Sequence, residues 1–119
     1  MDMDTILNIG LARNDGAPDN GVLRVVASLN DYGFKLLGGE VHEVTHAKGV
    51  ERTLIAHVEY QHHTQYLPAA IKALSNLLAQ DCIAVGYVED GKLRGGDLFG
   101  PLAAEWAPFN PDFFVLPTN

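Results

Sequence analysis

The sequence predicts an α+β domain with a ferredoxin-like, split βαββαβ order of elements. Two observations support this class. Four segments alternate apolar and polar residues or read as short apolar strands, and two segments repeat apolar residues at helical spacing. Their order along the chain is strand, helix, strand, strand, helix, strand. We therefore expect an antiparallel sheet with two helices on one face, and an aromatic and proline-rich C-terminal tail packed on the domain. At 119 residues, the chain is expected to form a single domain over residues 1–119.

The first two elements follow from residue spacing. Leu7, Ile9 and Leu11 recur at every second position, which is typical of a strand with one buried face. A loop over residues 14–18 separates this strand from a short helix. The apolar residues that share one face of that helix are Val22, Val25, Val26 and Leu29. Gly33 is expected to end the helix, because glycine readily adopts the left-handed conformation that follows a helical C-terminus.

The middle of the chain predicts a β-hairpin. One strand is expected to begin at Phe34 and, after the Gly38-Gly39 break, to run to His46. Lys48-Gly49 is the predicted turn, and residues 52–61 alternate as the returning strand.

The second half begins with the clearest helix, over residues 64–80, where Pro68 suits the first turn. A strand follows at residues 82–88. The glycines and bases of residues 91–97 predict a flexible hairpin or loop. In the tail from Leu98, the large aromatic residues that favour packing on the domain are Trp106, Phe109, Phe113 and Phe114.

The sheet face opposite the two helices has two interpretations. The residues expected there are Ile6, Asn8, Val44, Ile55, His57, Ala84 and Val88. This mixed, partly apolar surface could be a dimer interface or the floor of a ligand site. Alternatively, the C-terminal tail could cover it.

One short motif indicates a specific chemistry. The segment His42-Glu43-Val44-Thr45-His46 reads H-E-x-x-H, in which two histidines on a helix bind zinc. At the level of this motif the segment resembles the zincin metallopeptidases. That resemblance implies that His42 and His46 are metal ligands and that Glu43 is the general base of a zinc-dependent hydrolase.

The residues around the motif favour a strand over a helix. Val41, Val44 and Thr45 are β-branched, and two glycines precede the segment. On a strand, His42 and His46 would be ~13 Å apart, too far to share one zinc ion. Arg52 also stands where the extended metzincin motif has a third histidine. We therefore expect the strand, with the zinc site as the alternative.

A hairpin with a two-residue turn at Lys48-Gly49 would bring several polar residues together. Glu40 would face His57, and His42 would face Ile55. The candidate binding surface on the face away from the helices is then Glu40, His42, His57 and Glu59. Such a patch could bind a divalent metal or act as an acid–base pair. A slip of one residue would put His42 and His57 on opposite faces.

Composition excludes several function classes. The formal charge of −7 disfavours direct nucleic acid binding, which requires a basic surface. The single cysteine, Cys82, gives no disulfide framework and no cysteine-based zinc cluster. The acidic N-terminus does not resemble a signal peptide, and no apolar run reaches the length of a membrane helix. These features predict a cytoplasmic protein that does not associate with membranes.

Three functional hypotheses remain. The first is a non-enzymatic binding or interaction module without a cofactor, acting as a homo-oligomer, such as a homodimer, or on a protein partner. The first alternative is the zinc-dependent hydrolase at residues 42–46. The second is a small ligand-binding or enzymatic dimeric ferredoxin-like protein that uses His57 or His42 as a base. The sequence favours the first, because it contains no convincing catalytic set.

Overall fold

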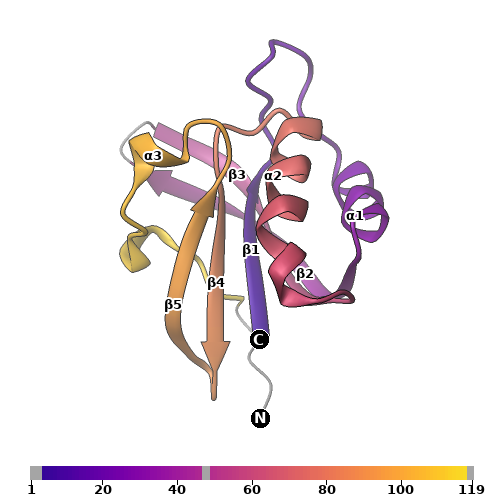
Figure 1. The fold of residues 1–119 in the computed structure, drawn as a ribbon. Coiled ribbons are helices and arrows are strands. Elements are labelled where there is room, and N and C mark those ends of the chain that lie inside the picture. Colours follow the sequence, from indigo (N-terminus) through magenta and orange to yellow (C-terminus); the bar gives the residue numbers. More distant parts are fainter. Residues whose placement is uncertain (1–3, 47–48, 118–119) are drawn as a thin grey trace.

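The computed structural model describes residues 4–46 and 49–117, which form one sheet, three helices and two 3₁₀ turns (Figure 1). The strands are β1 (Asp4–Gly10), β2 (Phe34–His46), β3 (Gly49–Tyr60), β4 (Ile83–Glu89) and β5 (Lys92–Phe99). The helices are α1 (Val22–Asp31), α2 (Leu67–Leu77) and α3 (Ala103–Trp106). The 3₁₀ turns are η1 (Thr64–Tyr66) and η2 (Pro111–Phe113).

The five strands are antiparallel and lie in the order β2-β3-β1-β4-β5. The predicted α+β class is confirmed. The specific ferredoxin-like order of strands is not confirmed, because β5 extends the sheet beyond β4. The sequence predicted either a hairpin or a flexible loop for residues 91–97, and the structure shows a hairpin. Its turn is Asp90-Gly91, with φ angles of 54° and 77°, which are typical of a two-residue type I′ turn.

Both long helices pack on the same face of the sheet (Figure 1). Val25 and Leu29 of α1 and Ile71 and Leu74 of α2 are fully buried there. The strand residues that meet them are Leu7, Ile9, Leu54, Ala56, Val58, Ile83 and Val85. Gly33 follows α1 with a φ of 88°, as its expected position requires. Within residues 4–46 and 49–117, no helix is long and apolar enough to cross a membrane.

The β2–β3 hairpin differs from its predicted register by two residues. His46 pairs with Gly49, so Glu40 lies opposite Ile55 and not opposite His57. The predicted turn was wrong because Gly49 already belongs to β3, while residues 47–48 lie outside the described residues. Over residues 38–46 this shift of two residues keeps side chains on their expected faces, while a β-bulge between Leu36 and Gly38 changes the register of residues 34–36.

The C-terminal segment after β5 crosses the sheet face that the helices leave open (Figure 1). Ile6, Ile55 and Val88 are buried on this face. The residues that cover them are Leu93 of β5 and Phe114, Val115 and Leu116 of the tail. The expected packing of the tail on the domain is therefore present, and the open face is largely covered.

A pair of hydrogen bonds fixes the tail at the centre of the sheet. The Asn8 side chain donates from Nδ2 to the carbonyl oxygen of Val115 at 3.1 Å. Its Oδ1 accepts from the backbone N–H of Val115 at 2.9 Å. One amide side chain thus satisfies both backbone groups of Val115, as a neighbouring strand would.

Replacing Asn8 with alanine should loosen this attachment. Asn8→Ala removes both bonds and leaves the Val115 backbone groups without those partners, so the free energy of unfolding should fall by about 1–3 kcal/mol. Chemical denaturation would measure it. Asn76→Ala, at an exposed position of α2, is the control and should stay within about 0.5 kcal/mol of the parent protein. A similarly small change for Asn8→Ala would contradict the role given to this pair.

Candidate functional site

A cavity of about 290 Å³ lies between the sheet and the C-terminal tail. Its floor comes from the sheet face opposite the two long helices. The floor residues are Asn8 and Gly10 of β1, Glu51 and Thr53 of β3, Ala84 of β4 and Leu98 of β5. Because alternate residues of a strand share a face, the floor continues the surface to which the tail is attached.

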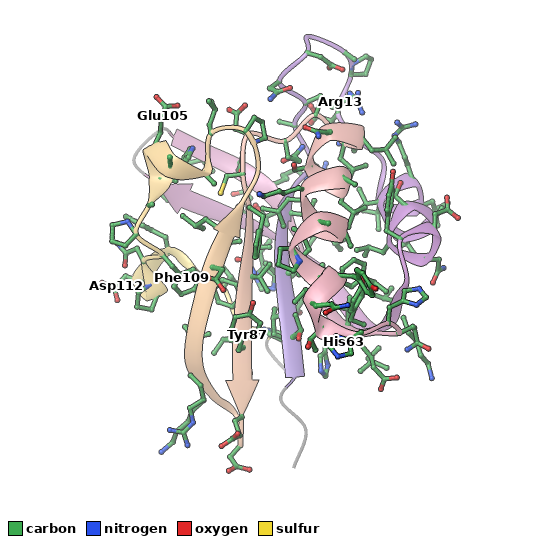
Figure 2. The ribbon with its side chains drawn as sticks, in the orientation of Figure 1. Arg13, His63, Tyr87, Glu105, Phe109 and Asp112 are labelled. Carbon is green, nitrogen blue, oxygen red and sulfur yellow. The ribbon has the colours of Figure 1, made fainter. Side chains whose placement is uncertain are left out.

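The opposite wall is aromatic and comes from the tail. Its residues are Trp106, Phe109, Phe113 and Phe114. The Phe109 and Phe114 rings contact each other, with centroids 5.5 Å apart. Figure 2 shows Phe109 beside β5, in the segment after α3. The wall therefore offers flat apolar surfaces of the kind on which a heterocyclic ring can stack.

The Phe114 and Phe109 rings pack directly against two glycines, one in β4 and one in β5. A β-carbon at Gly86 would lie 2.4 Å from the Phe114 ring, and one at Gly96 would lie 2.4 Å from the Phe109 ring. Such distances leave no room for a larger residue without a shift of the ring. Gly86 and Gly96 thus set how closely the aromatic wall approaches the sheet.

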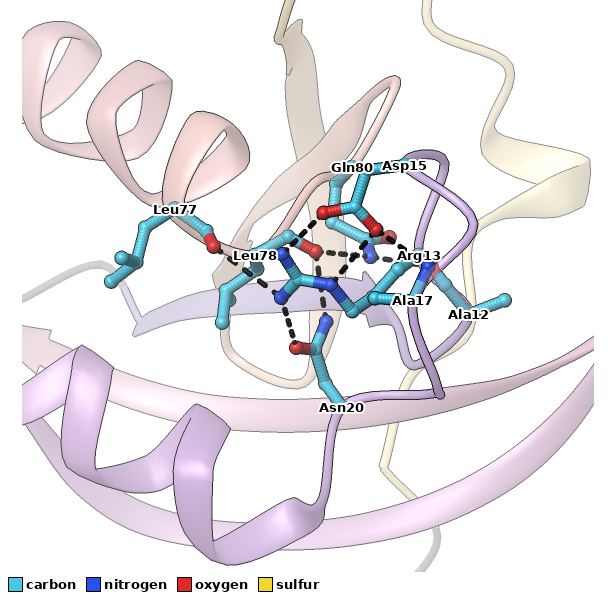
Figure 3. Close-up of polar contacts among 8 residues, drawn as sticks. All are labelled: Ala12, Arg13, Asp15, Ala17, Asn20, Leu77, Leu78 and Gln80. Atoms are coloured by element: carbon cyan, nitrogen blue, oxygen red, sulfur yellow. Dashed lines mark hydrogen bonds and ion pairs between the residues drawn. The ribbon is translucent and has the colours of Figure 1, made fainter.

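The rim of the cavity consists of two loops held together by polar contacts (Figure 3). Arg13, in the loop after β1, donates from Nη1 to Asn20 Oδ1 at 2.8 Å. Asn20 Nδ2 donates to the carbonyl oxygen of Leu78, at the end of α2, at 2.8 Å. The backbone N–H of Asn14 donates to the carbonyl oxygen of Ala79 at 2.9 Å. The loops after β1 and α2 are consequently linked.

The charges at the rim are largely used within the protein. Arg13 makes two hydrogen bonds to Asp15, at 3.1 and 2.7 Å, which together with the Ala17 N–H lower the pKa of the Asp15 carboxyl to about 2. The Asn14 side chain donates to the carboxylate of Asp81. Arg13 is thus paired with Asp15, and the cavity lining also contains the carboxylates of Glu51 and Asp81.

Glu51 and Gln80 converge at the floor. A β-carbon at Gly10 would lie 2.9 Å from Glu51 Oε1 and 2.7 Å from Gln80 Oε1. The two oxygens therefore both pack over Gly10 at this end of the cavity. Both are acceptors, so this end of the cavity suits a group that donates hydrogen bonds.

Cys82 also lines the cavity. Burial raises the pKa of its thiol to about 11. The thiol is therefore protonated at neutral pH, and a protonated thiol is a poor nucleophile.

The H-E-x-x-H segment lies on β2, and the zinc hydrolase alternative is wrong for this reason. Residues 34–46 are one strand, so the backbones at His42 and His46 are ~13 Å apart rather than one helical turn. Glu43 is exposed, and the side chain of His46 lies outside the described part of the chain. Among the described residues there is no group of three or more potential metal-ligating side chains.

The four residues of the predicted binding surface are only partly brought together. Glu40 and His42 do meet, with His42 Nε2 3.1 Å from Glu40 Oε1. His57 lies opposite Gly38, and Glu59 lies opposite Lys35. The two-residue register difference therefore places His57 diagonally across from Glu40 on the same face, instead of directly opposite it. Neither His42 nor His57 lines the cavity described here.

The residues that do form the cavity were largely missed from sequence. Asn8 and Ala84 were expected on the open face, and the aromatic tail was expected to pack on the domain, but Glu51, Gln80 and Asp81 were not singled out. The glycines within β4 and β5 were a usable signal, because glycine inside a strand often marks the close approach of another group. The pairing of Glu51 with Gln80 depends on two loops meeting and had no local signal.

Comparison with known proteins identifies one informative likeness. No family model matches the chain, and no curated protein matches it. Among solved structures, the fold is similar to that of a phage SAM lyase in complex with S-methyl-5′-thioadenosine. The TM-score is 0.52 and the sequence identity is 17%, over 89% of this chain and 92% of that chain. At this identity the likeness concerns the fold.

This likeness contradicts the predicted non-enzymatic interaction module, because the solved protein with a similar fold is an enzyme. The prediction relied on the lack of a recognisable catalytic set in the sequence. That criterion fails for a site whose residues come from separate strands, loops and a tail, since no short motif then marks it.

Adjacent glycines of β5 provide a test of how the aromatic wall is set. Gly96→Ala would place a methyl group against Phe109, whereas a β-carbon at Gly95 meets no atom within 4 Å. We expect Gly96→Ala to lower the free energy of unfolding by about 1–3 kcal/mol through overpacking. Thermal and denaturant unfolding would measure the change. Gly95→Ala is the matched control and should leave stability nearly unchanged; equal effects at both positions would contradict this account of the wall.

Proposed function

We propose that this protein is an enzyme that cleaves S-adenosylmethionine (SAM) without water, releasing S-methyl-5′-thioadenosine, and that the cavity beneath the tail is its site. The observation that carries the proposal is an aromatic and acidic cavity in a fold similar to that of a phage SAM lyase. Shared fold alone carries little functional information, so the chemistry of the cavity must supply the rest.

The cavity has the composition that this substrate requires. Its volume of about 290 Å³ is near the lower end of ligand pockets, which suits a nucleoside-sized group. Trp106, Phe109 and Phe113 offer apolar surfaces for adenine. Glu51 and Asp81 give the cavity a negative character, which favours a ligand with a positively charged sulfonium.

The proposed reaction balances without a co-reactant. The carboxylate oxygen of the methionine part attacks its own Cγ, and the bond between Cγ and the sulfonium sulfur breaks. The electron pair stays on sulfur, which becomes the neutral thioether of S-methyl-5′-thioadenosine. The other product is the lactone of homoserine, with its ammonium unchanged. Because the nucleophile and leaving group belong to one molecule, holding it folded supplies much of the acceleration.

The side chains that line the cavity agree with such a reaction. The neutral thioether leaves without protonation, so no general acid is needed. The substrate supplies its own nucleophile, so the protonated Cys82 thiol is not required to react. The described lining residues include no histidine. Their task in this proposal is to bind, orient and shield the substrate from water.

We further propose that the chain self-associates. Val41 of β2 and Val50 of β3 are 39% and 64% exposed, and β2 is a thirteen-residue strand at the edge of the sheet. A long edge with exposed apolar side chains favours pairing with another chain.

Two finer expectations belong to the same proposal. One is that strands β1 to β4 with α1 and α2 form a ferredoxin-like core to which β5 is added, which the order β2-β3-β1-β4 supports. The other is a cytoplasmic location, which remains a prediction from the sequence.

The activity can be measured directly. The purified protein should convert SAM to S-methyl-5′-thioadenosine, detected by liquid chromatography with mass spectrometry. Ala84→Leu extends a side chain from the cavity floor and should lower kcat/KM about tenfold or more, equivalent to about 1.4 kcal/mol. Ala69→Leu, at an exposed position of α2 on the other side of the sheet, is the control and should retain activity. Absence of both turnover and binding of S-methyl-5′-thioadenosine would rule the proposal out.

Self-association predicts a mass above the 12.9 kDa of one chain in size-exclusion chromatography with light scattering. A charge buried between chains is costly, so Val50→Asp should reduce the mass toward that of the monomer. Leu23→Asp is the control, because Leu23 is 86% exposed on α1 and lies away from the hairpin. A monomeric parent protein at high concentration would show that the exposed hairpin does not mediate self-association.

A further inference from the structure

We propose that Glu51 and Gln80 form a ribose subsite, in which the Glu51 carboxylate and the Gln80 carbonyl oxygen accept hydrogen bonds from the cis-diol of a nucleoside. This inference rests on the proposed function and names the part of the substrate that these two residues recognise. It depends on three structural features: the fixed orientation of Gln80, the approach of Glu51 and the lack of a side chain at Gly10, which lets both oxygens pack close to the strand.

Gln80 is held in one orientation by its own amide nitrogen. Nε2 donates to the carbonyl oxygen of Ala12 at 2.7 Å and to that of Leu78 at 3.1 Å (Figure 3). Both donor positions of the amide are therefore used. The side chain is only 5% exposed, so it has little freedom to rotate.

The carbonyl oxygen of Gln80 is consequently the atom that faces the cavity. Among the described residues, none donates a hydrogen bond to this oxygen. A buried acceptor that faces a ligand cavity gains most when the ligand supplies its donor. Gln80 is thus positioned to accept from a bound molecule.

Glu51 approaches the same volume from β3. Its Oε1 and that of Gln80 lie 2.9 Å and 2.7 Å from the position that a Gly10 β-carbon would take. A ligand group in the cavity that reaches both oxygens meets two acceptors, one from β3 and one from the loop after α2. The adjacent hydroxyls of a ribose supply two donors on neighbouring carbons, and carboxylates commonly bind ribose hydroxyls in nucleotide-binding proteins.

Gly10 lets these two oxygens pack close to the backbone of β1. Its backbone does not adopt a positive φ, so alanine would be conformationally acceptable at this position. The constraint is therefore one of space, since a methyl group would lie within 2.9 Å of both oxygens and would force them to move. In a nucleoside the ribose is joined directly to the base. A ribose at Gly10 would therefore leave the base near the aromatic wall of the cavity.

The test compares two ligands by isothermal titration calorimetry: S-methyl-5′-thioadenosine and its 2′,3′-dideoxy analogue. Both keep the base and the thioether, and neither has an ammonium group. We expect the parent protein to bind the dideoxy analogue about 10- to 100-fold more weakly, because hydrogen bonds to a charged acceptor are lost. Glu51→Gln should bind S-methyl-5′-thioadenosine about tenfold more weakly and lose most of this discrimination.

Matched variants separate the subsite from general effects on folding. Glu59→Gln changes an exposed acid on the same strand and should preserve both affinities. Gly10→Ala should weaken binding of S-methyl-5′-thioadenosine more than tenfold. Gly38→Ala, whose β-carbon would meet no atom within 4 Å, should not. Thermal unfolding of each variant would verify that it is folded.

The outcomes are distinguishable. Discrimination in the parent protein that is reduced in Glu51→Gln supports the ribose subsite. Equal binding of the two nucleosides overturns the subsite but leaves the proposed lyase standing. If the affinity for SAM alone then falls in Glu51→Gln, the pair binds the substrate ammonium instead. If neither nucleoside nor SAM binds, both this inference and the proposed function fail.

Discussion

The attachment of the tail to the uncovered face of the sheet is the constraint on which the cavity depends. A five-stranded sheet with both long helices on one face leaves Ile6, Ile55 and Val88 in need of cover on the other. The tail supplies that cover, and Asn8 replaces the partner strand that the Val115 backbone would otherwise lack. Apolar burial holds the tail down, while the two hydrogen bonds fix where along the sheet it lies. The aromatic wall then stands at a set distance from the floor.

A second set of contacts makes the polar end of the cavity independent of the tail. Gln80 is anchored by the carbonyl groups of Ala12 and Leu78, and Arg13 and Asn20 link the same two loops. The loops therefore behave as one polar structure at the ends of β1 and α2. An apolar wall from one part of the chain thus faces a polar floor from another, which is the usual composition of a small-molecule site.

Most of the secondary structure could be predicted, because α1, α2 and the central strands bury one face and so impose clear periods on the sequence. For β5 the sequence did not decide between a hairpin and a loop, because Gly95 and Gly96 remove the alternation of apolar and polar residues that would mark a strand. The hairpin register was missed by two residues because local sequence does not fix where pairing resumes after a turn. The cavity was harder still: Glu51, Gln80 and Asp81 meet through tertiary contacts, and none belongs to a short motif. Conversely, the H-E-x-x-H motif is present in the sequence, but it lies on a strand and not on the helix that zinc binding by this motif requires.

The two faces of the sheet also differ in how much structure each supports. The helix side contains an extended core that includes Leu7, Ile71 and Val85, whereas the tail side buries a small cluster around three residues. Local opening of the tail should therefore require less free energy than global unfolding, so backbone amides near Val115 should exchange with solvent sooner than those of β1. A molecule bound between the sheet and the aromatic wall would oppose that opening. Slower amide exchange near Val115 would therefore report that the cavity is occupied.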